Sequence, residues 1–262
     1  MEIGKKTLIM GILNVTPDSF SDGGKFNNID NALSHAKKMQ DEGADIIDIG
    51  GESTRPGSDK VDEDEEISRV IPILKKLKKE IDVIISVDTS KANVAKVALE
   101  NGANIINDVW GLQKEPEIAN YIAEYDVPVV IMHNKINNIY ENDIIESMKE
   151  FFSVSLEIAK KAGIKKENIF LDPGIGFGKD PEQNIEVMAR LDELNEIGYK
   201  MLLGTSRKSM IGYILDLPSD QRLEGTIATN VIGVINGYDI VRVHDVKEHV
   251  NALKVTDRIY RR

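Results

Sequence analysis

Charged and amide side chains recur where short apolar runs of this chain end. They include Asn14, Asp88, Asn107, Asp172, Lys208, Arg242 and His244. Carboxylates and amides hydrogen-bond the edges of a flat heterocycle, and neighbouring cations bind an anion. Burying such groups is unfavourable unless a ligand or a partner group satisfies them. The pattern therefore predicts one polar binding site assembled from many separate segments.

The cations among these groups are concentrated late in the chain. They are Arg207, Lys208, Arg242 and His244, and Arg55 from an earlier loop can join them. The whole chain carries a formal net charge of -11, which disfavours nucleic acid and anionic membranes as partners. An anionic substrate would therefore need a local positive patch, and these residues predict one.

The stretch DPGIGFGK, residues 172–179, resembles a phosphate loop only at first sight. It lacks the spacing and the terminal Ser or Thr of a Walker A motif, and it lacks the G-x-G-x-x-G spacing of a dinucleotide fold. We interpret it as the turn after a strand, with glycines that allow close backbone approach. Asp172 begins the turn and is predicted to point inward. A carboxylate there matches a ligand with paired N–H donors, such as an amino-pyrimidinone ring.

Other kinds of chemistry have little support in the sequence. There is no cysteine, which excludes disulfides, thiolate metal sites and a cysteine nucleophile and fits a cytoplasmic location. No H-E-x-x-H or G-x-S-x-G motif occurs. The N-terminus lacks the regions of a signal peptide, and no apolar stretch approaches the ~18 residues of a membrane span.

Eight apolar runs must position these side chains. They cover residues 7–15, 44–51, 82–89, 104–111, 128–134, 168–174, 200–206 and 239–246, and segments of helical periodicity separate them. Such runs suit parallel strands buried on both faces. Eight strand–helix units without a linker predict an α/β fold, a (β/α)8 TIM barrel, as a single domain over residues 1–262. An open doubly wound sheet is the alternative.

Local signals refine this barrel. The acidic run at 61–66 is predicted to open a helix, and Ser90 is predicted to cap the next one. In such a barrel the active site lies at the carboxyl ends of the strands, and phosphate is often held after the last two. The first long loop, TPDSFSDGGKFNN at residues 16–28, has the composition of a lid and carries one central aromatic, Phe20.

Seven motifs in chain order resemble those of the dihydropteroate synthases. They are GILNVTPDSFSDGG, GESTRPGS, SVDTSK, INDVWG, DPGIGFGK, TSRKS and RVHDV, and they span the chain from the first run to the last. The resemblance implies a Mg²⁺-dependent transferase that joins 6-hydroxymethyl-7,8-dihydropterin diphosphate to p-aminobenzoate and releases diphosphate. It also implies a homodimer that packs through late helices.

The resemblance assigns roles to residues of this chain. The pterin would contact Asp88, Asn107, Met132, Asp172 and Lys208. The p-aminobenzoate site and its loops would use Phe20, Thr54, Arg55, Pro56, Phe177 and Ser209. The diphosphate would be held by Asn14, Arg55, Arg242 and His244, with Asn14 beside the Mg²⁺. Asp88, Lys208, Arg242 and His244 would act in catalysis.

The implied chemistry is a dissociative substitution in which diphosphate leaves and Asp88 stabilises the positive charge on the pterin methylene. The chain departs from the common family pattern after His133, where NKINNIYEND replaces a Met-Gln-Gly-x-Pro-like segment. We expect His133 to be a structural histidine. Two other functions compete: a methyltetrahydrofolate:corrinoid methyltransferase on the same barrel, and a non-catalytic pterin carrier. Neither needs the late cation patch.

Overall fold

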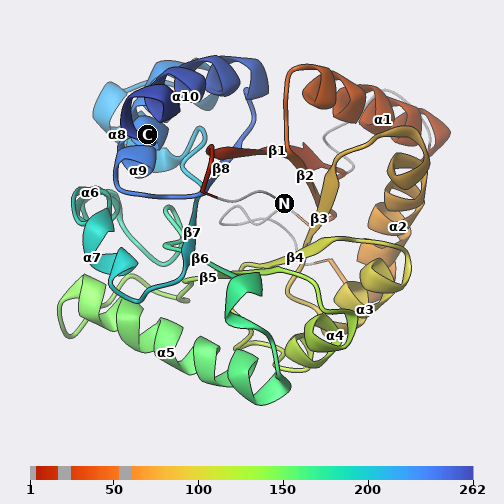
Figure 1. Ribbon diagram of the computed structural model, residues 1–262, viewed down its shortest axis with the longest axis horizontal. Helices are drawn as coiled ribbons and strands as arrows, with labels where there is room; N and C mark the ends of the chain where they lie inside the picture. The colour runs from red at the N-terminus through yellow and green to blue at the C-terminus, as the bar shows by residue number, and fades with distance from the viewer. Residues whose placement is uncertain (1–3, 17–24, 53–60, 262) are drawn as a thin grey trace.

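A closed barrel of eight parallel strands forms the centre of the protein (Figure 1). The computed structural model describes residues 4–16, 25–52 and 61–261. Each strand pairs with its neighbours in chain order, and β1 closes the ring on β8. The strands are β1 (Leu8–Asn14), β2 (Ile46–Gly50), β3 (Ile84–Asp88), β4 (Ile105–Asp108), β5 (Val129–Met132), β6 (Ile169–Asp172), β7 (Lys200–Leu203) and β8 (Ile240–Val243). The predicted TIM barrel is confirmed, and the open sheet is wrong.

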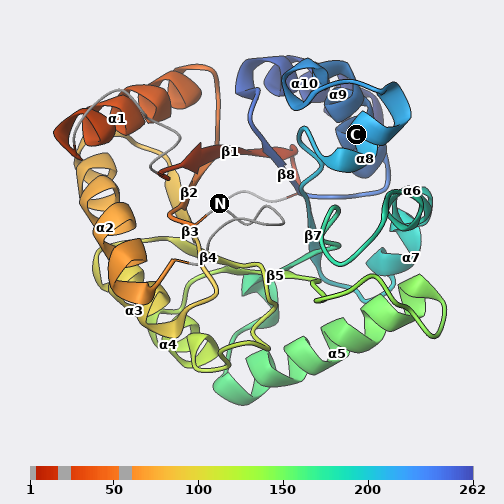
Figure 2. The ribbon, with the colours of Figure 1, turned by 180° about the vertical axis from the view of Figure 1, so that it is seen from behind.

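Helices surround the barrel on all sides, as the views from the front and from behind show (Figures 1 and 2). In the described part of the chain they are α1 (Lys25–Asp41), α2 (Glu63–Glu80), α3 (Ala92–Glu100), α4 (Ile118–Tyr125), α5 (Ile144–Ala162), α6 (Pro181–Ala189), α7 (Leu191–Asn195), α8 (Ser209–Leu215), α9 (Leu223–Ile235) and α10 (Val246–Tyr260). Short 3₁₀ turns occupy Lys166–Asn168 and Ser219–Gln221. Within the described ranges, no helix combines the length and apolarity needed to cross a membrane.

Two helix starts bear on the predictions made from the sequence. Asp62 caps α2 by accepting the Glu65 N–H, and the acidic run fills the first turn of that helix. Ser90 does not cap α3, because Lys91 holds the cap position and the Ser90 hydroxyl accepts from the Lys114 ammonium at 3.2 Å. That part of the prediction was wrong, since the chain needs one more extended residue before it turns into the helix.

The inside of the barrel is filled by one apolar layer contributed by all strands except β3, with Ile84 of β3 packed against it. The layer consists of Leu8, Met10, Ile46, Ile105, Val130, Phe170, Leu202 and Ile240. Side chains alternate between the two faces of a strand, so the residue two positions later on each strand also points inward. On five strands that next residue is Asp48, Asn107, Met132, Asp172 or Arg242. The layer of inward-facing side chains above the apolar layer is therefore largely polar, and it forms the floor of the barrel mouth.

Candidate active site

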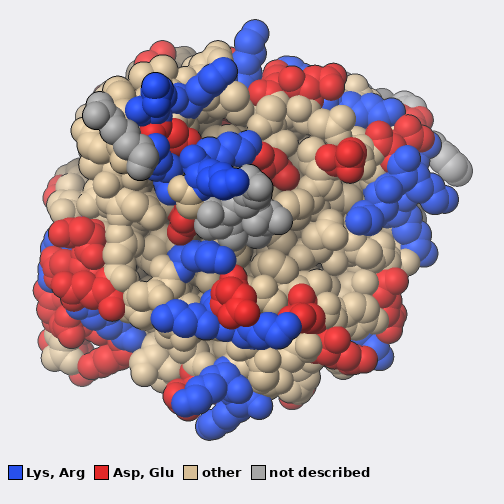
Figure 3. Space-filling model, viewed as in Figure 1, with Lys and Arg blue, Asp and Glu red and all other residues tan. Residues whose placement is uncertain are grey.

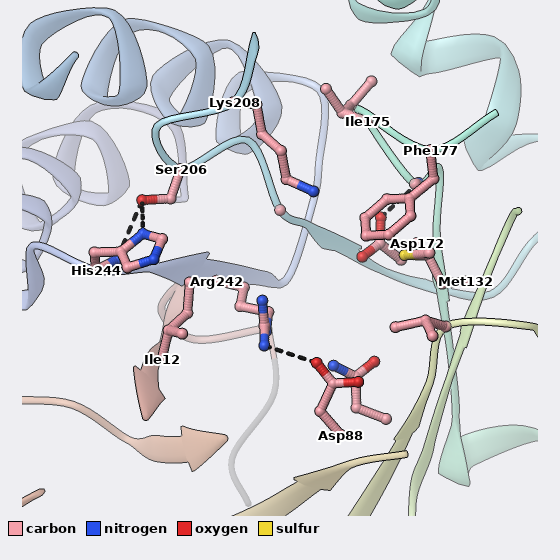
Figure 4. Close-up of a pocket in the computed structure, with 14 residues that line it drawn as sticks. Ile12, Asp88, Met132, Asp172, Ile175, Phe177, Ser206, Lys208, Arg242 and His244 are labelled. Carbon is pink, nitrogen blue, oxygen red and sulfur yellow. Dashed lines mark hydrogen bonds and ion pairs between the residues drawn. The ribbon is translucent and has the colours of Figure 1, made fainter. Parts of the chain in front are cut away.

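A pocket at the mouth of the barrel gathers residues from almost every strand end (Figure 4). Its lining comprises Ile12, Asp88, Asn107, Val109, Met132, Asp172, Gly174, Ile175, Phe177, Gly204, Ser206, Lys208, Arg242 and His244. In the close-up, the Lys208 ammonium and the Arg242 guanidinium extend into the space above Asp88 and beside Asp172. Two cations and two carboxylates therefore face one cavity.

Arg242 is the centre of a buried charge network on the pocket floor. Its Nε donates to Asp48 Oδ2 at 2.7 Å, and its Nη2 donates to Asp88 Oδ2 at 2.9 Å. The Asp48 side chain has no exposure, and that of Asp88 is 7% exposed. Burial raises the pKa of Asp88 to about 7, with Arg242 opposing the rise and Asp48 adding to it. The two carboxylates thus hold the guanidinium in place between β2 and β3.

Asn107 is oriented by the same network. Its amide nitrogen donates to Asp48 Oδ2 at 3.1 Å, because a carboxylate can only accept. The amide oxygen is thereby turned away from Asp48, and it has no hydrogen-bond partner among the described residues. Asn107 lines the pocket, and this oxygen is a buried acceptor in the pocket wall that the described part of the chain leaves without a partner.

Asp172 supplies a second acceptor at the floor. Its Oδ1 accepts the Gly174 N–H at 2.7 Å, and its Oδ2 lies beside Gly204 in the pocket wall. Burial raises the pKa of Asp172, while the Gly174 N–H and the Lys208 charge oppose the rise. The carboxylate is therefore held by the turn that follows it, and it keeps one oxygen for a donor in the pocket.

Lys208 covers the floor from the loop after β7. Its ammonium lies 4.1 Å from the centre of the Phe177 ring, a cation–π contact. Burial lowers the pKa of Lys208 to about 8, with Asp172 opposing the shift and Arg242 adding to it. The pocket lining thus includes an ammonium that lies over the Phe177 ring.

The glycines of the turn after β6 allow this close packing. Gly174 has φ +63°, and a Cβ added there would lie 2.0 Å from the His133 carbonyl oxygen. Gly178 has φ +57°, and its added Cβ would lie 2.6 Å from the Lys135 carbonyl oxygen. The turn therefore runs against the loop after β5, whereas the sequence predicted a close approach of the backbone to something in the mouth of the barrel.

The late cation patch splits into two parts. His244 lines the pocket, and its Nδ1 lies 2.9 Å from the Ser206 hydroxyl. Arg207 is bound to Asp245 instead, with its Nη2 at 2.5 Å and its Nε at 3.1 Å from the carboxylate oxygens. Arg207 has φ +57°, so the backbone turns there and separates its side chain from that of Lys208.

The structure brings most of the predicted site residues together. Asp88, Asn107, Met132, Asp172, Phe177, Lys208, Arg242 and His244 all line the pocket. Ser209 is exposed at the first position of α8 and is not part of this lining. Phe20, Thr54, Arg55 and Pro56 lie outside the described residues.

Sequence reasoning missed Asp48, Ser206 and Lys179. Asp48 lies inside an apolar run, two positions after the inward-facing Ile46. That inward register was the signal that could have found it. Lys179 and Ser206 make their contacts through loops, and no spacing in the sequence reports those contacts.

Asn14 meets the requirements of an oxygen ligand for a hard cation. A Cβ added at Gly50 would lie 3.6 Å from Asn14 Oδ1 and 3.9 Å from Asp88 Oδ2, so both oxygens border the same gap at the mouth. Mg²⁺ in proteins commonly takes one or two protein oxygens, several waters and substrate phosphates. Among the described residues, no group of three or more His, Cys, Asp or Glu side chains could hold a metal. Asn14 Oδ1 is thus one oxygen of the kind that Mg²⁺ binds, while Asp88 Oδ2 already accepts from Arg242.

On the face in view, Lys and Arg side chains are interspersed with Asp and Glu side chains (Figure 3). An anionic substrate would therefore be bound by the cations inside the mouth rather than by the rim.

Comparisons with known proteins show what the whole chain is similar to. The family model described as "Pterin binding enzyme" matches residues 10–244. A dihydropteroate synthase of Clostridium beijerinckii is 58% identical over 99% of this chain and 97% of its own. The crystal structure of the Clostridium difficile dihydropteroate synthase in the presence of pteroic acid has 61% identity, full coverage of both chains and a TM-score of 0.98. That of the Xanthomonas albilineans enzyme with 4-aminobenzoic acid has 39% identity, coverage of 98% and 94%, and a TM-score of 0.93.

Proposed function

The chain belongs to the pterin-binding enzymes and, within them, to the dihydropteroate synthases, and from this premise we propose how its barrel mouth carries out their reaction. It is a transferase of folate biosynthesis. It joins 6-hydroxymethyl-7,8-dihydropterin diphosphate to p-aminobenzoate and yields 7,8-dihydropteroate and diphosphate. The matched relatives carry this name over nearly their full length, so the alternative corrinoid methyltransferase is set aside.

The pterin binds on the polar floor. The open oxygens of Asn107 and Asp172 accept N–H groups from the ring, and Lys208 donates to a ring acceptor. Met132 supplies apolar contact to the ring, and Phe177 lies in the same lining on the side proposed for p-aminobenzoate. The observation that carries the proposal is this pair of buried acceptors in a pocket that also contains two cations, because it matches a ligand with both paired donors and an anionic tail.

The leaving diphosphate lies toward Arg242 and His244. As the C–O bond breaks, the electron pair moves onto the diphosphate, and Arg242 stabilises that growing charge from its fixed position. Asn14 would be the side chain that holds a Mg²⁺ here, and the metal would supply further charge stabilisation for the leaving diphosphate. Asp88 stabilises the positive charge left on the pterin methylene.

The amine of p-aminobenzoate then forms the new C–N bond and releases a proton to solvent. An arylamine attacking a cationic carbon needs little activation, so positioning supplies the rest of the rate enhancement. A rate that is insensitive to the leaving group but rises steeply with amine nucleophilicity would argue against the dissociative order.

One assay tests the activity. Purified protein with dihydropterin diphosphate and Mg²⁺ should form dihydropteroate only when p-aminobenzoate is added. Lys208→Ala should lower kcat/KM by about 10²–10³, as expected for removal of one preorganised charged donor. Lys160→Ala is the matched control, because Lys160 lies on α5 with its side chain 80% exposed. Tight pterin binding without product would favour the carrier reading.

We also propose a homodimer through the late helices. The supporting observation is an apolar surface on α8, α9 and α10, which neighbour one another in Figure 1. Its exposed residues are Tyr213, Ile214, Leu215, Ile232, Ile235, Val255, Ile259 and Tyr260. Val255 and Ile259 are four positions apart, so they share one face of α10. A patch of this kind commonly marks a protein interface.

The dimer prediction concerns that face of α10. The double variant Val255→Glu, Ile259→Glu should sediment as a monomer while the wild type sediments as a dimer, because two carboxylates would be buried unpaired at the interface. Ile136→Glu is the control, since Ile136 is 91% exposed on the loop after β5. A double variant that stays dimeric would rule out this surface. The Mg²⁺ dependence and the cytoplasmic location stay predictions.

A further inference from the structure

The ammonium of Lys179, at the end of the turn after β6, contacts both that turn and the neighbouring loop. Its Nζ donates to the carbonyl oxygens of Pro173, Gly174 and Phe177 at 3.0, 3.1 and 3.1 Å. The same nitrogen lies 2.9 Å from His133 Nδ1. Four acceptors from two loops therefore converge on one ammonium, which has three hydrogens to share among them.

His133 is the partner in the neighbouring loop. Its side chain is buried against Phe151, with ring centroids 4.8 Å apart. Burial and the nearby Lys179 charge lower the pKa of His133 well below its ordinary value, so the ring is neutral and its Nδ1 accepts from Lys179. His133 is thus a structural histidine, as the sequence predicted, and it anchors the ammonium from the β5 side.

The four acceptors around Lys179 favour its protonated form, the ammonium. Burial lowers the pKa of Lys179 to about 7, and the Asp172 carboxylate opposes that shift. Three backbone carbonyls also favour the ammonium, because a neutral amine has fewer hydrogens and no charge to offer them.

The turn held by Lys179 carries two contacts of the active site. Its Gly174 N–H fixes the Asp172 carboxylate at 2.7 Å, and its Phe177 ring lies 4.1 Å below the Lys208 ammonium. On the outside, the Tyr140 hydroxyl donates to the Gly178 carbonyl at 2.9 Å. Tyr140 belongs to the segment where the chain departs from the common family pattern. The turn is therefore held from both sides and presents Phe177 to the pocket.

We propose that Lys179 is a positioning residue of the synthase reaction: its ammonium ties the carbonyls of the turn after β6 to the ring of His133 and so places Phe177 for the incoming p-aminobenzoate. The proposal rests on the proposed function. Lys179 itself touches no reacting atom. Asp88, Asn107 and Asp172 of the pterin floor stand on barrel strands, and of these three only Asp172 also contacts the turn, through the Gly174 N–H.

The expected effect is uneven between the two substrates. With Lys179→Met, the KM for p-aminobenzoate should rise about tenfold and kcat should fall about tenfold or more, in line with the sensitivity of rates to small misplacements. The dissociation constant of pterin, measured with pterin alone as the ligand, should change less than about threefold. Three groups of the floor, Asp88, Asn107 and Asp172, remain on their strands. A general loss of folded protein would instead lower the apparent kcat and leave both the KM for p-aminobenzoate and the dissociation constant of the pterin unchanged.

The absence of cysteine in the chain allows a chemical control. In Lys179→Cys, the single thiol is alkylated in urea with 2-bromoethylamine, which rebuilds an ammonium at lysine length, or with iodoethane, which leaves a neutral chain. After refolding, the aminoethylated protein should recover the wild-type KM for p-aminobenzoate, and the ethylated protein should not. Lys160→Cys carried through the same steps controls for the alkylation and refolding.

Each outcome is decisive. Recovery specific to the aminoethyl group, together with the return of a hydrogen-bonded His133 Nδ1 signal in nitrogen NMR, supports the proposal. Equal kinetics in the two alkylated forms, or wild-type kinetics in folded Lys179→Met, overturn it. If the wild type itself forms no dihydropteroate, the proposed function fails, and the NMR signal alone then reports whether Lys179 holds His133.

Discussion

An Arg242→Met variant should lose both its turnover and several kcal/mol of folding stability. The guanidinium is the only described partner of Asp88 Oδ2 and one of two for Asp48 Oδ2. Removing it leaves two buried carboxylates without their cation, and breaking such a pair destabilises a protein by about 3–5 kcal/mol. The growing charge on the diphosphate also loses its donor, which lowers kcat by about 10²–10³. Urea unfolding and steady-state kinetics measure the two effects.

A combined variant separates the two losses. Adding Asp48→Asn and Asp88→Asn to Arg242→Met removes both unpaired charges and should restore much of the unfolding free energy. Turnover should stay low, because the diphosphate donor and the Asp88 carboxylate are still absent. Wild-type stability in the single Arg242→Met variant would show that the network does not contribute as its distances suggest.

Asp172→Asn should lower kcat/KM by about 10⁴, the discrimination typical of a site whose buried polar partner no longer matches its ligand. The change keeps the size of the side chain and replaces one acceptor oxygen with an NH₂ donor. A pterin edge with paired N–H groups then meets a donor, which is a repulsive contact as well as a lost one. Isothermal titration with pterin should show the same loss in binding.

The Asp172→Asn substitution should lower activity, but it should raise folding stability relative to wild type as the pH rises. Burial raises the folded-state pKa of Asp172 above its ordinary value of 3.8, so ionising this group is harder in the folded than in the unfolded protein. Ligand-free wild type therefore loses stability relative to the variant as pH rises from about 4 toward neutrality, where Asn has nothing to ionise. A difference in unfolding free energy between wild type and variant that does not change with pH across this range would contradict the buried-carboxylate account.

Strand periodicity explains why the floor of the site was predictable. Asp88, Asn107, Asp172 and Arg242 follow apolar runs, and a parallel barrel has only one place for the ends of its strands. The partner of Arg242 was not predictable in the same way. Asp48 is 194 positions away in the chain, and only barrel closure brings β8 close enough to reach it.

Loop contacts account for the other differences. Lys179 was interpreted as the end of a glycine turn, and its four acceptors come from backbone and side-chain atoms that have no sequence signature. Ser206 rather than Ser209 faces the described pocket, because the backbone reverses at Arg207 with φ +57°. Propensity does not predict a positive φ at an arginine, so the order of side chains around that bend was not available from the sequence.

The floor of the site is the next layer of side chains above the apolar core of the barrel. Substrate binding to this layer should therefore raise the unfolding free energy of the protein. A bound pterin completes a stack of side chains that otherwise ends in unfilled acceptors such as Asn107 Oδ1. Free ligand at 100 times its dissociation constant would add about 2.7 kcal/mol to the unfolding free energy. The melting temperature of the protein therefore reports occupancy of the floor, and a cell with little pterin would hold a less stable population of the enzyme.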